Sequence, residues 1–149
     1  MDLRETISLL MKLISFDTSP PRKRGSNLQL PYDIFALRGI NSTLFSFVQG
    51  RPSFYAYIKG KEPSSVILSG HLDTVAPLGN WTCSPFSPIE EGGKIYGLGS
   101  SDMKGGVAIL TEGMKFLKEN GYKIPAQAHL SRDLTKIEEF GIIVRCSRR

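Results

Sequence analysis

Residues 66–75 read Val-Ile-Leu-Ser-Gly-His-Leu-Asp-Thr-Val, and this stretch decides how the fold is interpreted. Its first three residues form a continuous apolar run, which is typical of a strand that is covered on both faces of a sheet. We therefore expect a central strand at Val66–Leu68. His71 follows this strand, at the carboxyl edge where open α/β sheets place their ligands.

The remainder of the chain alternates between helical and strand patterns. Asp2 and Glu5 resemble a capping box, and apolar residues then recur at helical spacing over Leu3–Ser15. A second amphipathic helix is predicted over Gly105–Asn120, with Gly121 as its C-terminal cap. The alternation predicts an α/β fold. The other predicted elements are a loop at Thr18–Asn27, a short helix from Pro31 to Gly39, and strands at Phe54–Ile58 and Ile95–Tyr96.

The composition is that of a folded, water-soluble domain. The chain has 149 residues, of which 40% are hydrophobic and 22% charged, and this length fits a single domain. No stretch approaches the ~20 apolar residues that cross a bilayer, so no membrane partner is expected. The amino terminus lacks the features of a signal peptide, and Cys83 and Cys146 form no CxxC motif. We therefore expect a cytoplasmic protein.

The net charge of +5 comes largely from two basic segments. Arg22–Arg24 lies in the predicted loop, and Arg145–Arg149 holds three arginines at the end of the chain. Nucleic-acid binding through these residues is one hypothesis, and it predicts an affinity that falls with salt. A solvated loop and a solvated tail explain the pattern more simply, so no nucleic-acid partner is expected.

Two polar clusters carry ligand-type side chains. In an extended segment, residues i and i+2 point to the same side, so Asp73 can orient one nitrogen of His71 while the other binds a metal. Asp102 lies within residues 97–106, where glycines and serines precede the second helix. The phosphate-loop patterns are not matched there, and a metal-bound carboxylate fits better. The simpler alternatives are a surface histidine and a helix-capping aspartate.

A third cluster is the acidic pair Glu138-Glu139. Adjacent carboxylates point in different directions, so one can bind a metal while the other accepts a proton from water. The alternative is a charged pair on a solvated surface.

Together, several segments resemble the M20 family of metallo-aminoacylases and exopeptidases. They are Ser69–Val75, Trp81–Phe86, Gly93–Gly97 and Ser100–Gly106, in this order. The family includes acetylornithine deacetylase, succinyl-diaminopimelate desuccinylase, aminoacylase and carboxypeptidase G enzymes. The resemblance is strong from about Val66 to Tyr122. It implies the amino-terminal part of a zinc-exopeptidase-like catalytic domain, which has a mixed sheet flanked by helices.

The resemblance also implies roles for individual residues. The histidine ligand of the family falls on His71, and the aspartate that orients it falls on Asp73. The aspartate that bridges two zinc ions falls on Asp102, and the peptide bond after it is typically cis. The Glu-Glu pair of the family would give Glu138 as general base and Glu139 as metal ligand. The implied cofactors are two divalent metal ions, with zinc expected and cobalt or manganese as alternatives.

The implied reaction is hydrolysis of an amide bond in N-acyl amino acids or dipeptides, in a family that often dimerises through a lid domain. This chain departs from the pattern. Leu98 replaces a usual arginine, and the tail at about 126–149 is the least family-like part. Three of five expected metal ligands have a counterpart here, and the lid domain has none. We interpret 1–149 as a partial catalytic, metal-binding domain, either of an active deacylase or exopeptidase or as a truncated, non-catalytic remnant.

Overall fold

The computed structural model describes residues 2–19, 33, 36, 39–48, 51–59, 64–65, 67–121, 126–127 and 139–145. The helical elements are α1 (Leu3–Ser15), the single turn η1 (Ser100–Lys104) and α3 (Gly105–Glu119). The strands are β1 (Asn41–Val48), β2 (Arg51–Lys59), β3 (Ser64–Ser65), β4 (Ile67–His71), β5 (Ile89–Glu91), β6 (Lys94–Tyr96), β7 (Ala126–Gln127) and β8 (Glu139–Arg145).

The predicted first helix is confirmed with the same bounds. The Asp2 carboxylate accepts a hydrogen bond from the backbone N–H of Arg4 at 2.8 Å, which satisfies one of the free amides at the start of α1. Glu5 differs from the capping-box expectation, because its carboxylate pairs with the ammonium of Lys115 in α3. This long-range ion pair therefore links the two helices.

The predicted second helix is also confirmed, as α3. Gly121 follows it with φ of 62°, the left-handed conformation that glycine adopts at the ends of helices. One face of α3 and one face of α1 are buried, and their apolar side chains share one core with residues of β2. The shared apolar core contains Leu9, Leu13, Ile40, Phe54, Ala56, Leu72, Val107, Ala108 and Met114.

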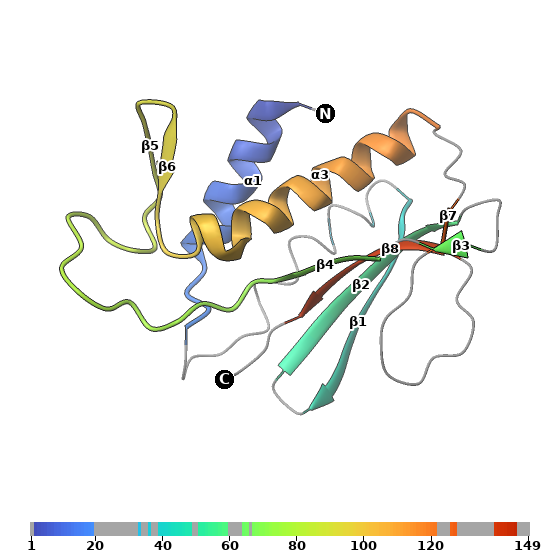
Figure 1. Ribbon diagram of the computed structural model, residues 1–149, viewed down its shortest axis with the longest axis horizontal. Coiled ribbons are helices and arrows are strands. Elements are labelled where there is room, and N and C mark those ends of the chain that lie inside the picture. Colours follow the sequence, from blue (N-terminus) through green and yellow to red (C-terminus); the bar gives the residue numbers. More distant parts are fainter. Residues whose placement is uncertain are drawn as a thin grey trace.

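The main sheet is mixed and has the strand order β1-β2-β8-β4. The β1–β2 and β2–β8 pairs are antiparallel, whereas β4 and β8 are parallel. Both described helices lie on the same side of this sheet (Figure 1). The predicted α/β architecture with a mixed sheet and flanking helices is thereby confirmed.

Two strands of this sheet were absent from the sequence prediction. β1 was not predicted, and β8 lies in the tail that seemed least family-like. The apolar run Phe140–Val144 suits a strand between two neighbours, but the polar residues before it obscured this signal. The predicted central strand is β4. In the described sheet β4 lies at the edge, because β8 lies between β2 and β4.

The smaller elements lie outside the main sheet. β5 and β6 form an antiparallel hairpin through Gly92 and Gly93, which both have positive φ, and β6 contains the predicted strand at Ile95–Tyr96. The predicted helix before Gly39 and most of the predicted loop after Thr18, including the basic residues 22–24, lie outside the described residues. In the part of the chain that is described, no helix has the length and apolar character needed to cross a membrane.

Candidate metal centre

His71 is placed by the end of β4. It is the last residue of the strand, and the next residue, Leu72, is fully buried and anchors the chain in the core. The preceding Gly70 packs against α3, where an added Cβ would lie 2.9 Å from the Cγ2 of Val107. Glycine therefore lets β4 approach the helix closely enough to bring His71 beside the turn that precedes it.

That turn, η1, carries Asp102. Gly99 opens the turn with φ of 83°, and its carbonyl accepts a hydrogen bond from the backbone N–H of Lys104 at 2.9 Å. Asp102 itself is extended, with φ of −132° and ψ of 98°. The peptide bond between Asp102 and Met103 is cis, as the resemblance implies. The side chain of Asp102 is 88% exposed, so its carboxylate is available to a ligand.

The structure brings His71, Asp73 and Asp102 together. The Nε2 atom of His71 lies 3.1 Å from Oδ1 of Asp102. The Nδ1 atom of the same ring lies 3.0 Å from the backbone oxygen of Asp73 and 3.6 Å from its carboxylate Oδ1. The shorter contact of Asp73 is thus made by its main chain, whereas the sequence pointed to its side chain.

This arrangement has the chemistry of a cation site. The backbone oxygen of Asp73 beside Nδ1 and the carboxylate of Asp102 beside Nε2 are both hydrogen-bond acceptors. A neutral imidazole has a single N–H, so one of its two nitrogens presents a lone pair toward an acceptor. A cation between Nε2 and the Asp102 carboxylate would remove this repulsion. The pair fits two ligands of a divalent metal.

The described residues supply only part of such a site. Within the described ranges, no group of three or more His, Cys, Asp or Glu side chains is arranged to hold a metal ion. Catalytic zinc sites commonly have three protein ligands and an open position. Two further protein or solvent ligands are therefore needed beside His71 and Asp102.

Lys104 is the last residue of η1, two positions after Asp102, and is fully buried. Its Nζ donates a hydrogen bond to the backbone oxygen of Phe16 at 2.9 Å. Burial lowers the pKa of the Lys104 ammonium to about 8, and the negative charge of Asp17 acts in the opposite direction. No local sequence pattern marks this lysine, because its hydrogen-bond partner lies 88 positions away in the chain.

The structure does not bring Glu139 to His71. In the parallel pair of β4 and β8, His71 lies beside Arg145, whereas Glu139 begins β8 at the other end. Arg145 lies six residue steps along the strand from Glu139, which is about 20 Å. Ligands from neighbouring parallel strands meet at their carboxyl ends, and that position of β8 holds Arg145. The register therefore puts the backbone of Glu139 at the opposite end of the strand pair from His71, and the ligand role of Glu139 stays a prediction from the resemblance. Glu138 lies outside the described residues.

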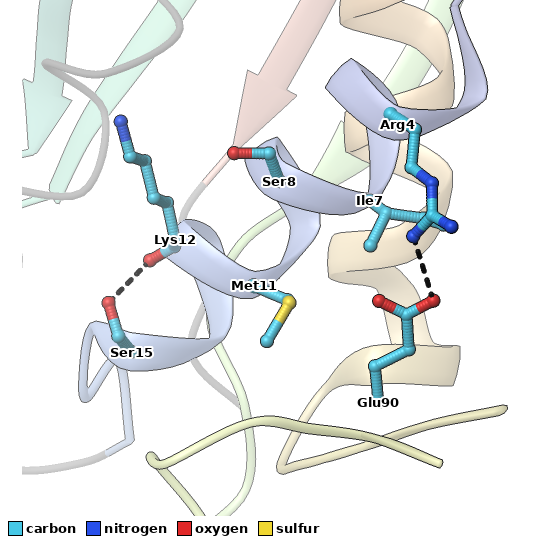
Figure 2. A pocket seen from close by; sticks show the side chains of 7 residues that line it. All are labelled: Arg4, Ile7, Ser8, Met11, Lys12, Ser15 and Glu90. Carbon is cyan, nitrogen blue, oxygen red and sulfur yellow. Dashed lines mark hydrogen bonds and ion pairs between the residues drawn. The ribbon is translucent and has the colours of Figure 1, made fainter. Parts of the chain in front are cut away.

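A shallow groove of about 450 Å³ lies elsewhere, between α1 and the β5–β6 hairpin. Figure 2 shows Arg4 of α1 pointing toward Glu90 of β5 across this groove, and their side chains form an ion pair at 3.5 Å. The groove is not lined by His71, Asp73 or Asp102, so it is separate from the candidate centre. Its lining residues are Arg4, Ile7, Ser8, Met11, Lys12, Ser15 and Glu90.

Comparison with protein families places this centre in a known context. Residues 67–131 match the model of "Peptidase family M20/M25/M40". The predicted resemblance to the M20 family is confirmed. The matched region contains His71, Asp73 and Asp102.

The chain is also similar to individual curated proteins. The chain is 34% identical over 114 residues to a succinyl-diaminopimelate desuccinylase from Nitratiruptor sp., covering 76% of this chain and 30% of that protein. It is 30% identical over 152 residues to the N-formyl-4-amino-5-aminomethyl-2-methylpyrimidine deformylase of Bacillus subtilis, covering 97% of this chain and 36% of the deformylase. The chain thus spans about a third of the length of the curated relatives it matches.

Solved structures share the fold. Human carnosine dipeptidase 1 has a TM-score of 0.71 at 18% identity, covering 95% of this chain and 32% of the dipeptidase. The M20 family metallo-carboxypeptidase Sso-CP2 from Sulfolobus solfataricus has a TM-score of 0.70 at 21% identity, covering 97% of this chain and 30% of Sso-CP2. At these identities the likeness concerns the fold alone.

Proposed function

We propose that this chain forms part of the active site of a metal-dependent hydrolase that cleaves amide bonds of N-acyl amino acids or small peptides. The observation that carries the proposal is the 3.1 Å approach of His71 Nε2 to Asp102 Oδ1 at the carboxyl end of β4. The match of residues 67–131 to the M20 family supports a metal-dependent exopeptidase or deacylase in general.

Each residue has a distinct role in this proposal. His71 would hold a divalent metal with its imidazole, and Asp73 would orient the ring through its contact with Nδ1. Asp102, whose side chain is exposed, would hold the metal with its carboxylate. When bound, the metals supply Lewis acidity that activates water and polarises the amide carbonyl. Zinc is the expected metal, with cobalt and manganese as alternatives, because the same ligand types serve all three.

The proposed substrate class follows from the relatives' names. Both sequence relatives are named for the removal of an acyl group, a succinyl group in one and a formyl group in the other. An N-acyl amine or N-acyl amino acid is therefore the first substrate to test, and a dipeptide is the second. The proton-accepting role of Glu138 stays a prediction from the resemblance.

A second candidate is a metal-binding but non-catalytic remnant of the same family. One observation favours it. The residues that the structure describes contain no group of three metal-binding side chains. In this case His71 and Asp102 would bind metal without enough further groups to turn over a substrate.

Metal binding is tested by titrating the purified chain with Zn²⁺ and with Co²⁺, whose absorption reports its ligands. Binding should be weakened at least tenfold by His71→Ala and by Asp102→Ala. Matched controls are His129→Gln, which removes the only other histidine, and Glu91→Gln, which removes an exposed carboxylate in β5. If the wild-type chain binds neither ion, or if the controls weaken binding equally, the proposed centre is wrong.

Turnover separates the two candidates. N-succinyl-diaminopimelate, an N-acetyl amino acid and a dipeptide are incubated with the zinc-loaded and cobalt-loaded chain. Hydrolysis that Asp102→Asn abolishes supports the hydrolase. Metal binding at His71 and Asp102 without any hydrolysis supports the remnant.

A further inference from the structure

The segments that carry His71 and Asp102 both contact the segment that follows α1. This segment, Phe16–Ser19, is here named the bracket. The hydroxyl of Thr18 donates to the backbone oxygen of Leu72 at 2.6 Å, directly between His71 and Asp73. On the other side, the backbone oxygen of Phe16 accepts the hydrogen bond from Lys104, two residues after Asp102.

The contact made by Thr18 is buried, and the contact made by Lys104 is partly buried. Thr18 is 1% exposed, and Leu72 and Lys104 are fully buried. Buried hydrogen bonds of this kind hold their partners in one arrangement, because water cannot replace a lost partner without entering the core. The bracket therefore fixes the position of residue 72 relative to residue 104.

The bracket is itself held rigidly. Leu13 and Ile14 in the last turn of α1 are fully buried, so the helix end has a fixed position. After it, the carboxylate of Asp17 accepts hydrogen bonds from the hydroxyl of Ser19 at 2.6 Å and from its backbone N–H at 3.1 Å. This local turn fixes the backbone on both sides of Thr18.

The choice of lysine at position 104 supports a role in positioning. A buried ammonium is costly to desolvate, and an apolar side chain of similar volume would fill the space without that cost. The ammonium nevertheless lies inside the core, where it reaches the carbonyl at the end of α1. The hydrogen bond from Lys104 to Phe16 therefore links the end of α1 to the turn η1.

We infer that Thr18 and Lys104 are positioning residues, which act through the bracket to set the spacing between His71 and Asp102. This inference rests on the proposed function, since the two positioned side chains are the proposed metal ligands. It assigns neither Thr18 nor Lys104 to the metal itself. Their hydrogen bonds end on main-chain oxygens, so they determine where the ligand segments lie.

The test compares two buried threonines. Thr18→Val removes the hydroxyl that bonds to Leu72 and keeps the side-chain shape, whereas Thr18→Ser keeps the hydroxyl. The matched control is Thr111→Val, since Thr111 is fully buried and its hydroxyl donates at 2.8 Å to Val107 within α3. For each variant, the Zn²⁺ dissociation constant and the urea midpoint of unfolding are measured.

Thr18→Val and Lys104→Met should weaken Zn²⁺ binding about tenfold, as losses of supporting groups at metal sites commonly do. Thr18→Ser and Thr111→Val should bind Zn²⁺ within about twofold of the wild type. If Thr18→Val and Lys104→Met bind Zn²⁺ like the wild type, or if Thr111→Val weakens binding as much as they do, the inference is overturned.

A second readout needs no metal. The chain has two histidines, so His129→Gln identifies the imidazole ¹⁵N signals of His71 in the metal-free protein. Thr18→Val should shift these signals, because the ring moves relative to Asp102, and Thr111→Val should leave them in place. If the His71 signals are unchanged in Thr18→Val, the positioning role of the bracket is contradicted, whether or not the wild-type chain binds zinc. A wild-type chain that binds no zinc contradicts only the proposed function.

Discussion

The ammonium of Lys115 in α3 bonds to the carboxylate of Glu5 in α1 and, at 2.9 Å, to that of Glu112 in its own helix. The Glu5 side chain is 51% exposed, whereas those of Lys115 and Glu112 are almost fully buried. One cation thus joins the two helices that cover the sheet.

Replacing this cation should cost much more than replacing its exposed partner. Lys115→Met leaves the Glu112 carboxylate buried without this ammonium, and we expect the free energy of unfolding to fall by about 3–5 kcal/mol. Glu5→Gln removes a half-exposed charge, with an expected loss of about 1 kcal/mol or less. Urea unfolding followed by circular dichroism measures both, and equal losses in the two variants would contradict this account.

Two glycines should respond in opposite ways to alanine. At Gly99, φ is 83° and an added Cβ would lie 2.7 Å from Cγ2 of Thr74, so Gly99→Ala should destabilise the protein by about 1–3 kcal/mol. Gly113 lies inside α3 with open space around it, and Gly113→Ala should stabilise by about 0.5–1 kcal/mol. Thermal unfolding of the two variants checks both signs. A stable Gly99→Ala protein would show that the turn before Asp102 tolerates a side chain.

The two aspartates of the candidate centre should differ in their effect on metal affinity. The backbone oxygen of Asp73 makes the closer contact with His71 Nδ1, and it remains in Asp73→Ala. We therefore expect Asp73→Ala to weaken Zn²⁺ binding by no more than about tenfold, and Asp102→Ala to weaken it more. Competition with a coloured chelator measures both constants. A larger effect of Asp73→Ala would assign the main orienting role to its carboxylate.

The burial of Lys104 predicts how stability varies with pH. Its pKa is lowered from 10.5 to about 8 in the folded protein, so between these values the unfolded chain binds more protons than the folded one. Stability should therefore rise with pH across this window. The free-energy cost of burying the Lys104 ammonium is fully present below pH 8. At 1.36 kcal/mol for each unit by which the pKa is lowered, this cost amounts to about 3 kcal/mol or less.

Urea unfolding of the wild type and of Lys104→Met at several values between pH 7 and pH 10.5 isolates this contribution, because groups common to both proteins cancel. The wild type should gain stability relative to Lys104→Met as the pH rises. A difference that does not change with pH would mean that Lys104 is solvated in the folded state.

The sequence predicted what depends on short-range patterns. The bounds of α1 followed from the Asp2 cap and the helical spacing of apolar residues, and the end of α3 followed from Gly121. His71 at the carboxyl end of β4 followed from one apolar run and one general rule of sheets. These features are determined within a few residues of one another in the chain.

The features that were missed depend on pairing between distant segments. Glu139 is a predicted metal ligand from the Glu-Glu pair of the resembling family, and neither this resemblance nor a local pattern shows that its backbone begins β8 at the end away from His71. Thr18 and Lys104 contact main-chain atoms 54 and 88 positions away in sequence. No local pattern marks such contacts, since a threonine and a lysine in isolation are ordinary surface residues.

The strand order of the main sheet has a consequence for biosynthesis. β8 separates β2 from β4, although both precede it in the chain by many residues. As the chain leaves the ribosome, β2 and β4 each keep an unpaired edge until residue 145 has been made, and such edges are prone to associate with other chains. Helices α1 and α3 are complete earlier and can pack together first. The nascent protein should therefore depend on chaperones until β8 inserts between β2 and β4.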